Sequence, residues 1–302
     1  MVLPPFLQAG DKVGIVSTSN YTVQAYIDEF VRILKDWDLK PVLGKSIGPR
    51  KGSFAGSDAL RKNDLQQMLD NDEIKAVFET MGGYGIMKVL EKVNFNKFKY
   101  APKWIVGYSD TTFLHTHLQG ILSTASIQGT MAADLEDGYK KASWESLRKA
   151  LFGEKLSYTV KPHPLNRVGI AEAVLVGGTI SVICNAKGTM SDVKTNGNIL
   201  FLEEVGEHQY RLDSYLTSLK LAGKFEYLRG LIVGQLTDIK EDDPPLGKTS
   251  EQIFMDVLKD YDFPICFGFP AGHGNVNKAL IFGATVQLTV TTKATTIEFK
   301  TQ

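Results

Sequence analysis

The stretch WIVGYSDTTFLHTHLQGIL, residues 104–122, decides how this chain folds. Its first five residues, Trp104–Tyr108, form an apolar run that predicts a buried β-strand. Residues 111–122 follow with the pattern of a helix, so the helix begins almost directly after the strand. A buried strand that leads straight into a helix is the repeating unit of α/β folds with parallel sheets.

The same unit recurs on the N-terminal side of this stretch. The patterns predict strands at Lys12–Ser17, Lys40–Leu43 and Ala76–Thr80, and helices at Tyr21–Leu39, after a cap at Ser57, and from Ile86 onward. This alternation predicts a doubly wound parallel sheet, whose ligands bind beyond the carboxyl ends of its strands. We therefore expect the chemistry in the loops that follow the strands.

The second half of the chain is richer in strand. Short strand-like runs occur at Tyr158–Lys161, Gly169–Val176, Asn198–Glu203 and Gly230–Gly234, and Val286–Phe299 alternates like an antiparallel pair. Helices are predicted at Arg211–Ala222 and Ser250–Asp260. Turn-forming residues break the pattern between 153 and 168. We therefore place one α/β domain at residues 1–155 and a second domain at residues 168–302.

The composition favours a small-molecule or peptide partner. The chain has 302 residues, of which 43% are hydrophobic, and this length suits two packed domains. Its 34 Lys and Arg residues balance 34 Asp and Glu residues. No overall field would therefore attract nucleic acid or an anionic membrane.

The N-terminus and the cysteines predict a cytoplasmic protein. Residues 1–12 have no basic segment ahead of a long apolar run, so we predict no secretory signal. No stretch approaches the roughly 18 to 20 apolar residues that a membrane helix requires. Cys184 and Cys266 each lie in an apolar run without metal-like spacing, and we expect buried, reduced thiols.

Ser109 stands at the turn between the strand and the helix of residues 104–122. A serine at such a turn exposes its hydroxyl beside a helix N-terminus, where free N–H groups favour developing negative charge. The sequence departs from the G-x-S-x-G elbow because Thr111 stands in place of the last glycine. A helix cap formed by Ser109 or Asp110 is the alternative interpretation.

A glycine-rich turn, residues 80–85 (TMGGYG), follows the strand predicted at 76–80. Glycines there let backbone N–H groups approach a ligand, as an oxyanion hole or a phosphate cradle requires. The dinucleotide pattern G-x-G-x-x-G fails because Lys88 occupies the last glycine position. This failure argues against a nicotinamide-dependent oxidoreductase, and a plain tight turn remains the alternative.

His273 lies between two glycines in the loop 269–275 (FPAGHGN). A histidine without bulky neighbours is placed to reach a cleft, although an exposed loop histidine would have the same pattern. The remaining histidines, which we expect to be structural, are His115, His117, His163 and His208. No histidine has the spacing of a zinc site, so we expect neither a metal nor another cofactor.

Glu203 and Glu204 end the apolar run at 199–202. A carboxylate at a strand end can orient a catalytic histidine, although acidic residues also simply end strands. Strand alternation turns the two carboxylates to opposite faces, so only one can face the cleft unless a bulge intervenes. With Ser109 and His273, the chain holds a nucleophile, an orienting acid and a base in the order Ser, Glu, His.

Taken in order, these motifs resemble those of the LD-carboxypeptidase family of serine peptidases, which includes muramoyl-tetrapeptide carboxypeptidases and microcin C immunity peptidases. The resemblance runs nearly from end to end of the chain. It rests on residues 7–11 (LQAGD), 54–58 (FAGSD) with Arg61, 82–85 (GGYG), 107–110 (GYSD), 175–178 (LVGG), 201–207 (FLEEVGE), 210–213 (YRLD) and 268–274 (GFPAGHG).

The resemblance implies a Rossmann-like N-terminal domain, a mainly β C-terminal domain and a Ser-Glu-His triad at their interface. It places the nucleophile at Ser109, the base at His273 and the orienting carboxylate at Glu203, with Glu204 as the alternative one residue further on.

The resemblance also suggests the groups that surround the triad. The oxyanion donors would be the backbone N–H of Asp110 and one N–H from the turn at Gly82 and Gly83. The resemblance does not identify the groups that bind the substrate carboxylate. Arg211 and Arg61 are candidates, although an arginine on a helix is more often a surface or ion-pair residue. Tyr84 is a further candidate for binding the substrate.

Three motifs depart from the family pattern and leave the substrate open. Met81 stands where an arginine is common, residues 128–130 (QGT) replace His-Gly-Pro, and Thr179 replaces an asparagine. We expect hydrolysis of an amide bond next to a free carboxylate, in the first place release of D-Ala from a murein tetrapeptide.

Two alternatives remain. One is cleavage of a peptidyl or aminoacyl nucleotide, as in the immunity branch, and the other is a non-catalytic protein that binds murein peptides. In each case we expect a small peptide or muropeptide as partner, and we expect the protein to be a homodimer.

Overall fold

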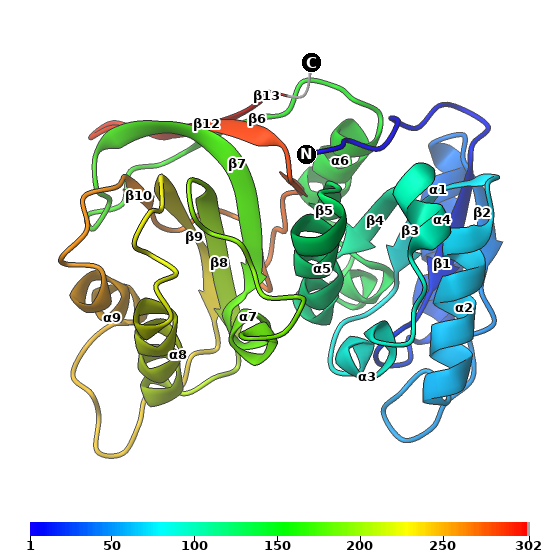
Figure 1. Ribbon diagram of the computed structural model, residues 1–302, viewed down its shortest axis with the longest axis horizontal. Helices are drawn as coiled ribbons and strands as arrows, with labels where there is room; N and C mark the ends of the chain where they lie inside the picture. The colour runs from blue at the N-terminus through cyan, green and yellow to red at the C-terminus, as the bar shows by residue number, and fades with distance from the viewer. Residues whose placement is uncertain (301–302) are drawn as a thin grey trace.

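The computed structural model describes residues 1–300, which form two β-sheets that lie beside each other (Figure 1). The N-terminal half builds the sheet on the right of the view, and most of the C-terminal half builds the sheet on the left. Helices flank both sheets. The predicted fold class is therefore confirmed, with a parallel α/β part and a second part that is mainly β.

Within residues 1–300, six strands form the first sheet in the order β11-β5-β4-β3-β1-β2. The parallel strands are β1 (Lys12–Val16), β2 (Lys40–Leu43), β3 (Ile74–Glu79), β4 (Trp104–Gly107) and β5 (Ser126–Gln128). The edge strand β11 (Leu280–Phe282) is antiparallel to β5. The alternation of strands and helices thus predicts this sheet except for its returning edge strand.

Helices cover both faces of the first sheet, and most residues of its inner strands β1, β3 and β4 are buried. Ile15 and Phe78 pack toward α1 and α6, whereas their neighbours Val16 and Val77 pack toward α2, α4 and α5. The helices of this half are α1 (Gln24–Asp36), α2 (Asp58–Asp70), α3 (Ile86–Leu90), α4 (Asn96–Tyr100), α5 (Thr112–Leu122) and α6 (Lys141–Leu151).

The second sheet has the order β10-β9-β8-β7-β12-β13-β6. Strands β7, β8, β9 and β10 are parallel to one another, and β12, β13 and β6 continue the sheet from β7 in antiparallel fashion. The strands are β6 (Ser157–Val160), β7 (Gly169–Thr179), β8 (Ile199–Val205), β9 (Gly230–Thr237), β10 (Ile265–Cys266), β12 (Thr285–Val290) and β13 (Thr295–Lys300).

Three helices of the second half pack with the parallel part of this sheet in one hydrophobic cluster. They are α7 (Ile180–Ala186), α8 (Gln209–Leu221) and α9 (Ser250–Val257). In Figure 1, α7 lies nearest to α5 of the first half. Contacts between α5, α7 and β7 therefore join the two halves.

Several elements were not predicted from the sequence: α4, α6, α7, β5 and β11. The runs at 126–128 and 280–282 are three residues long and too short to show a period. By contrast, Trp144, Leu147 and Leu151 give α6 a helical apolar pattern that could have been recognised.

The two sheets exchange segments across the boundary predicted between residues 155 and 168. Strand β6 lies between the two predicted domain ranges and pairs with β13 of the second sheet. Strand β11, from the C-terminal half, joins the first sheet. The boundaries at 1–155 and 168–302 remain predictions, because pairing alone does not define a domain.

Phe282 links the two sheets through its aromatic contacts. Its ring centroid lies 5.4 Å from the ring of His115 on α5 and 6.0 Å from the ring of Phe201 on β8. Phe282 and Phe201 are fully buried, and both belong to one hydrophobic cluster that spans the two sheets. The halves therefore share a core.

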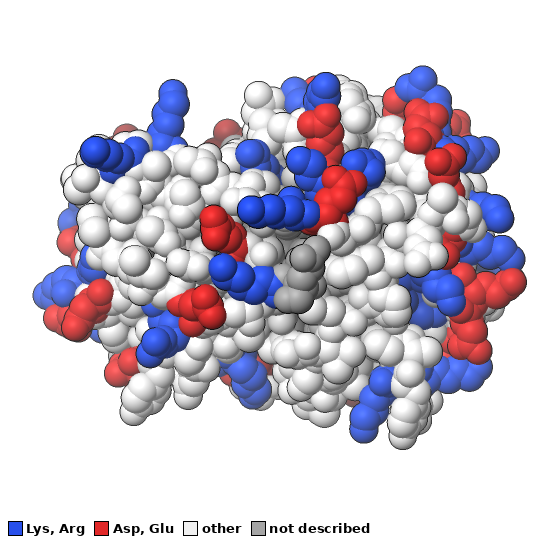
Figure 2. Space-filling view, turned by 90° about the horizontal axis from the view of Figure 1, so that it is seen from above, with Lys and Arg blue, Asp and Glu red and all other residues white. Residues whose placement is uncertain are grey.

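Charged side chains of both signs are interspersed on the face seen in Figure 2, with uncharged surface between them. This distribution matches the balanced charge of the chain and gives that face no extended field of one sign. Among the described residues, 1–300, no helix is long and apolar enough to cross a membrane.

Candidate active site

Ser109 occupies a strained turn between β4 and α5. Its φ of 61° lies in the left-handed region, which is unfavourable for a residue with a side chain. A single 3₁₀ turn, Ser109–Thr111, then leads into α5. The serine side chain is partly exposed, although its neighbours Tyr108 and Asp110 are buried. The local geometry is that of a strand-to-helix elbow.

The glycine turn after β3 approaches the elbow closely. A Cβ atom on Gly82 would lie 2.6 Å from the Cβ and 2.7 Å from the Oγ of Ser109. Gly83 has a φ of 95°, and a Cβ there would collide with the side chain of Asn20. Because only glycine fits at these two positions, the turn can pass between Asn20 and Ser109, and the backbone of Gly82 can lie directly beside the Ser109 side chain.

The buried side chain of Asp110 holds the turn that carries Ser109 in place. Its Oδ2 accepts hydrogen bonds from the Ser19 hydroxyl at 2.6 Å and from the Ile86 N–H at 2.9 Å. Burial raises the pKa of Asp110, and the same two hydrogen bonds act in the opposite direction. The carboxyl group thus connects the elbow to the start of α3, while its own backbone N–H stays on the Gly82 side.

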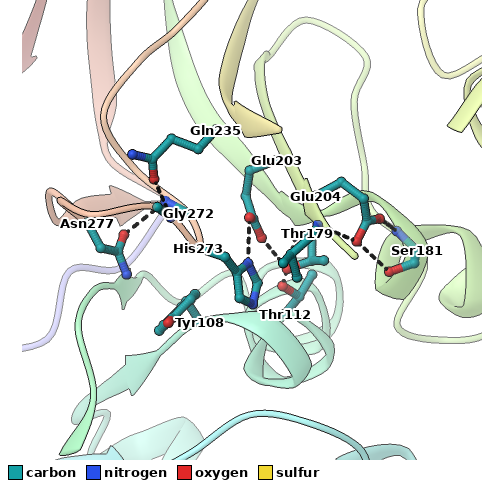
Figure 3. Close-up of polar contacts among 12 residues, drawn as sticks. Tyr108, Thr112, Thr179, Ser181, Glu203, Glu204, Gln235, Gly272, His273 and Asn277 are labelled. Atoms are coloured by element: carbon teal, nitrogen blue, oxygen red, sulfur yellow. Dashed lines mark hydrogen bonds and ion pairs between the residues drawn. The ribbon is translucent and has the colours of Figure 1, made fainter. Parts of the chain in front are cut away.

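His273 is held by Glu203 from the second sheet (Figure 3). The distance from His273 Nδ1 to Glu203 Oε2 is 2.8 Å, and the Glu203 side chain has no exposed surface. Burial disfavours the imidazolium, but the charge and the hydrogen bond of Glu203 outweigh this effect, so the pKa of His273 is raised. This contact fixes which ring nitrogen faces away from Glu203.

Two amide side chains hold the backbone on either side of His273 (Figure 3). Gln235 Oε1 accepts a hydrogen bond from the Gly274 N–H at 2.8 Å, and Asn277 Oδ1 accepts one from the Gly272 N–H at 3.1 Å. Gly272 has a φ of 119°, and a Cβ there would lie 2.6 Å from Glu203 Oε2. The glycine is therefore required for the loop to approach the carboxylate.

Glu204 points away from His273 and contacts the start of helix α7. Its Oε2 accepts a hydrogen bond from the Ser181 N–H at 2.7 Å, at the start of α7, and burial raises its pKa to about 7. The register between β8 and β9 shifts between Leu202 and Glu204. Of the two carboxylates, Glu203 is the one that contacts His273, which is the contact expected from the sequence.

Tyr108 brings the two halves of the site together. Its ring centroid lies 4.8 Å from that of His273, and its hydroxyl donates a hydrogen bond to Asp134 Oδ1 at 2.6 Å. Since Tyr108 immediately precedes Ser109, the elbow of the first sheet and the histidine loop of the second half are neighbours.

The candidate substrate-binding residues have partners of their own. Arg211 lies on α8 and forms an ion pair with Glu207 at 3.2 Å. Arg61 is fully buried and bonded to the Thr18 carbonyl and to Asp58, so it has a structural role in the first half. Tyr84 is exposed and lies 6.0 Å from Phe54, ring to ring.

The remaining histidines have the structural contacts expected of them. His115 is bonded to the Ser126 hydroxyl and the Gly107 carbonyl, and burial lowers its pKa to about 4. His117 contacts Ser191, and His208 contacts Asp242. Among residues 1–300, no group of three or more His, Cys, Asp or Glu side chains is arranged to hold a metal ion.

Sequence reasoning missed three polar groups of the site, Thr112, Gln235 and Asn277, and it named Thr179 without assigning it a role. Thr179 and Gln235 lie in the carboxyl-terminal parts of β7 and β9, where polar residues that follow apolar strands are a usable signal. Asn277 lies in a loop, and no sequence pattern distinguishes it.

A buried carboxyl group, Glu79, lies at the end of β3 beneath the site. It accepts hydrogen bonds from the Thr18 N–H at 3.0 Å and from the Thr18 hydroxyl at 2.8 Å. Burial outweighs these bonds and raises the pKa of Glu79 to about 8. Because this pKa differs from the ordinary value, the titration of Glu79 couples pH to the stability of the fold.

A serine on a strained elbow, with backbone N–H groups beside it and a carboxylate-bound histidine across the interface, is typical of serine hydrolases.

Comparison with known proteins identifies the family. A family model described as "LD-carboxypeptidase N-terminal domain" matches residues 13–129. A second, described as "LD-carboxypeptidase C-terminal domain", matches residues 172–288. The "probable murein peptide carboxypeptidase" of Bacillus subtilis is 31% identical over 98% of this chain and 94% of its own length. The chain belongs to the LD-carboxypeptidase family of serine peptidases.

Solved structures share the fold. The muramoyltetrapeptide carboxypeptidase from Oxalobacter formigenes aligns with a TM-score of 0.87 and 21% identity, covering 95% of this chain and 98% of that chain. The microcin C7 self-immunity protein MccF aligns with a TM-score of 0.86 and 21% identity, covering 99% of this chain and 98% of that chain. In sequence, MccF of Escherichia coli is 23% identical over 88% of this chain and 87% of its own length.

Replacing Gly82 with alanine should disable the elbow without unfolding the protein. The added Cβ would stand 2.6 Å from the Ser109 Cβ, so the turn and the elbow must move apart. A misplacement of this size can lower reactivity about 100-fold. The measurement is the rate at which a fluorophosphonate labels Ser109, followed by mass spectrometry. Gly120→Ala on α5 is the control, since its nearest neighbour would be 3.6 Å away. Equal labelling of both variants would contradict the prediction.

Glu79→Gln should remove part of the pH dependence of stability. The folded protein holds the Glu79 proton up to pH about 8, whereas the ordinary value is 4.5, so stability is full below 4.5 and is lost as pH rises through about 8. The neutral glutamine does not titrate and should flatten this loss. Urea unfolding between pH 5 and pH 8.5 measures the slope. Glu145→Gln, which alters an exposed ion pair, should keep the original slope. An unchanged slope in Glu79→Gln would refute the assignment.

Proposed function

We propose that this protein is a serine carboxypeptidase that hydrolyses an amide bond next to a free carboxylate. Ser109 is the nucleophile, His273 the general base and Glu203 the residue that orients the histidine. The observation that supports this proposal most directly is the 2.8 Å contact between His273 Nδ1 and the buried Glu203 Oε2. A carboxylate in that position leaves Nε2 free to accept a proton.

In the first step, Ser109 Oγ attacks the scissile carbonyl carbon and His273 Nε2 takes the hydroxyl proton. The negative charge on the carbonyl oxygen is stabilised by backbone N–H groups of Asp110 and of Gly82 or Gly83. The close approach of Gly82 to Ser109 supports this assignment. Loss of one such donor typically lowers turnover about 100- to 1,000-fold.

In the second step, the C–N bond breaks and His273 returns the proton to the leaving amine. Water then attacks the acyl-enzyme with His273 again acting as base, and Ser109 is regenerated. Glu203 stabilises the imidazolium in both steps, consistent with the raised pKa of His273. Since the mechanism generates its nucleophile from a side chain, it requires no metal.

The proposed substrate is a murein tetrapeptide, from which the enzyme releases D-Ala. The names of the Bacillus subtilis relative and of the Oxalobacter formigenes structure support this choice. The likeness to MccF favours a second candidate, a peptidyl or aminoacyl nucleotide. Tyr84 and Arg211 remain predicted substrate-binding residues, and the cytoplasmic location and the homodimer remain predictions as well.

Purified protein should release D-Ala from a murein tetrapeptide, and Ser109→Ala should release none above background. Ser109 contributes little packing, so the variant should stay folded by circular dichroism. Mass spectrometry of the released amino acid is the measurement. Turnover of Ser109→Ala should be lower than that of the wild type by on the order of a million-fold, as for a well-studied triad serine.

A wild type that leaves the tetrapeptide intact but cleaves an aminoacyl nucleotide would favour the second candidate. Binding of the muropeptide without cleavage of either substrate would instead indicate a non-catalytic protein. Full activity of Ser109→Ala would exclude the serine mechanism.

Glu203→Gln should lower turnover far more than Glu204→Gln. The first substitution keeps the shape of the side chain and removes the charge beside His273, which can cost up to about 10,000-fold in a triad. Glu204 contacts Ser181, so its substitution leaves the His273 contact in place. Turnover of both variants is measured at saturating substrate, with thermal unfolding as the check on folding. A larger loss in Glu204→Gln would reverse the assignment.

A further inference from the structure

Thr179 lies where the second half of the chain meets the nucleophile helix. It is the last residue of β7 and precedes α7, and its side chain is almost fully buried. In Figure 3 it lies between Glu203 and Thr112.

The Thr179 hydroxyl binds the oxygen of Glu203 that the histidine does not use. Thr179 Oγ1 donates a hydrogen bond to Glu203 Oε1 at 2.5 Å, whereas Oε2 contacts His273 Nδ1 at 2.8 Å. Each oxygen of this buried carboxylate therefore has one partner, and the plane of the carboxylate is held from both sides.

The backbone of Thr179 contacts the nucleophile helix. Its N–H donates a hydrogen bond to Thr112 Oγ1 at 3.1 Å, and Thr112 is the first residue of α5, directly after the turn that holds Ser109. The neighbouring residue packs equally closely, because a Cβ on Gly178 would lie 2.4 Å from Thr112 Oγ1. One residue thus contacts both the helix that follows the nucleophile and the carboxylate that binds the base.

We propose that Thr179 is a positioning residue that aligns the Glu203 carboxylate, and through it His273, with the Ser109 elbow. This inference rests on the proposed function, since it concerns the same site. The Thr179 side chain does not act on the substrate. Its hydroxyl sets the orientation of the carboxylate, and its backbone N–H ties that carboxylate to the elbow of the other half.

The hydroxyl should also influence the protonation of His273. Removing this hydrogen-bond donor leaves more negative charge on the Glu203 carboxylate to interact with the ring, so the imidazolium of His273 should persist to higher pH. A role confined to packing would not produce this change.

The test compares Thr179→Val, which keeps the shape and removes the hydroxyl, with Thr179→Ser, which keeps the hydroxyl. The probe is a fluorophosphonate, whose phosphorus is attacked by Ser109 Oγ; fluoride leaves as the P–O bond forms, and His273 accepts the serine proton. The rate of labelling is recorded from pH 5 to pH 9 with thermal unfolding of each variant. Ser181→Ala, which removes a hydroxyl that contacts Glu204 instead, is the matched control.

In Thr179→Val we expect labelling to slow about tenfold or more at neutral pH. We also expect the acidic limb of the plot of labelling rate against pH to move up by about one pH unit, which is the size expected for one hydrogen bond to a charged group. Thr179→Ser and Ser181→Ala should keep the acidic limb of the wild type. A limb that stays in place in Thr179→Val, or moves equally in Thr179→Ser, would overturn the inference. If the wild type is not labelled at Ser109 at all, the proposed function fails instead, so the two failures are distinguishable.

Discussion

The side chain of Glu203 has no exposed surface, and a carboxylate removed from water is destabilised unless hydrogen bonds replace its hydration. Much of the local structure follows from this constraint. One oxygen is bound by Thr179 and the other by His273. Gly272 must lack a side chain because its backbone passes directly over the carboxylate. The histidine loop, the end of β7 and the end of β8 are therefore fixed relative to one another by a single buried group.

The site belongs to neither half of the chain alone. The first sheet presents Ser109 on its elbow and the glycine turn beside it, and the second presents Glu203 and the loop of His273. Tyr108 and Thr112, which flank the serine, contact His273 and Thr179 across the interface. A shift of the two halves by one ångström would separate these groups, and catalysis by positioned side chains is sensitive to displacements of that size. The shared core around Phe282 opposes such a shift.

The sequence predicts the parallel sheet because long apolar strands and amphipathic helices alternate with a clear period, as at β4 and α5. The resemblance to the family implies the contact between His273 and Glu203, whereas strand alternation alone leaves Glu203 and Glu204 as alternatives. The sequence does not predict which polar groups complete the site. The partner of Glu204 depends on a register shift in β8, and Asn277 reaches the Gly272 N–H only through the path of its loop. Arg61 is a substrate candidate by motif, yet the fold buries it against Thr18 and Asp58.

The position of β11 at the edge of the first sheet has a consequence for biosynthesis. Its partner β5 ends at Gln128, whereas β11 begins at Leu280, so a ribosome must add about 150 residues before the pairing can form. At about 5 to 20 residues per second, this takes about 8 to 30 seconds. During that time the nascent N-terminal half exposes an unpaired strand edge, which is a template for aggregation. Because β5 has only three residues, this exposed edge is short, and a short edge strand limits pairing with other chains until β11 arrives.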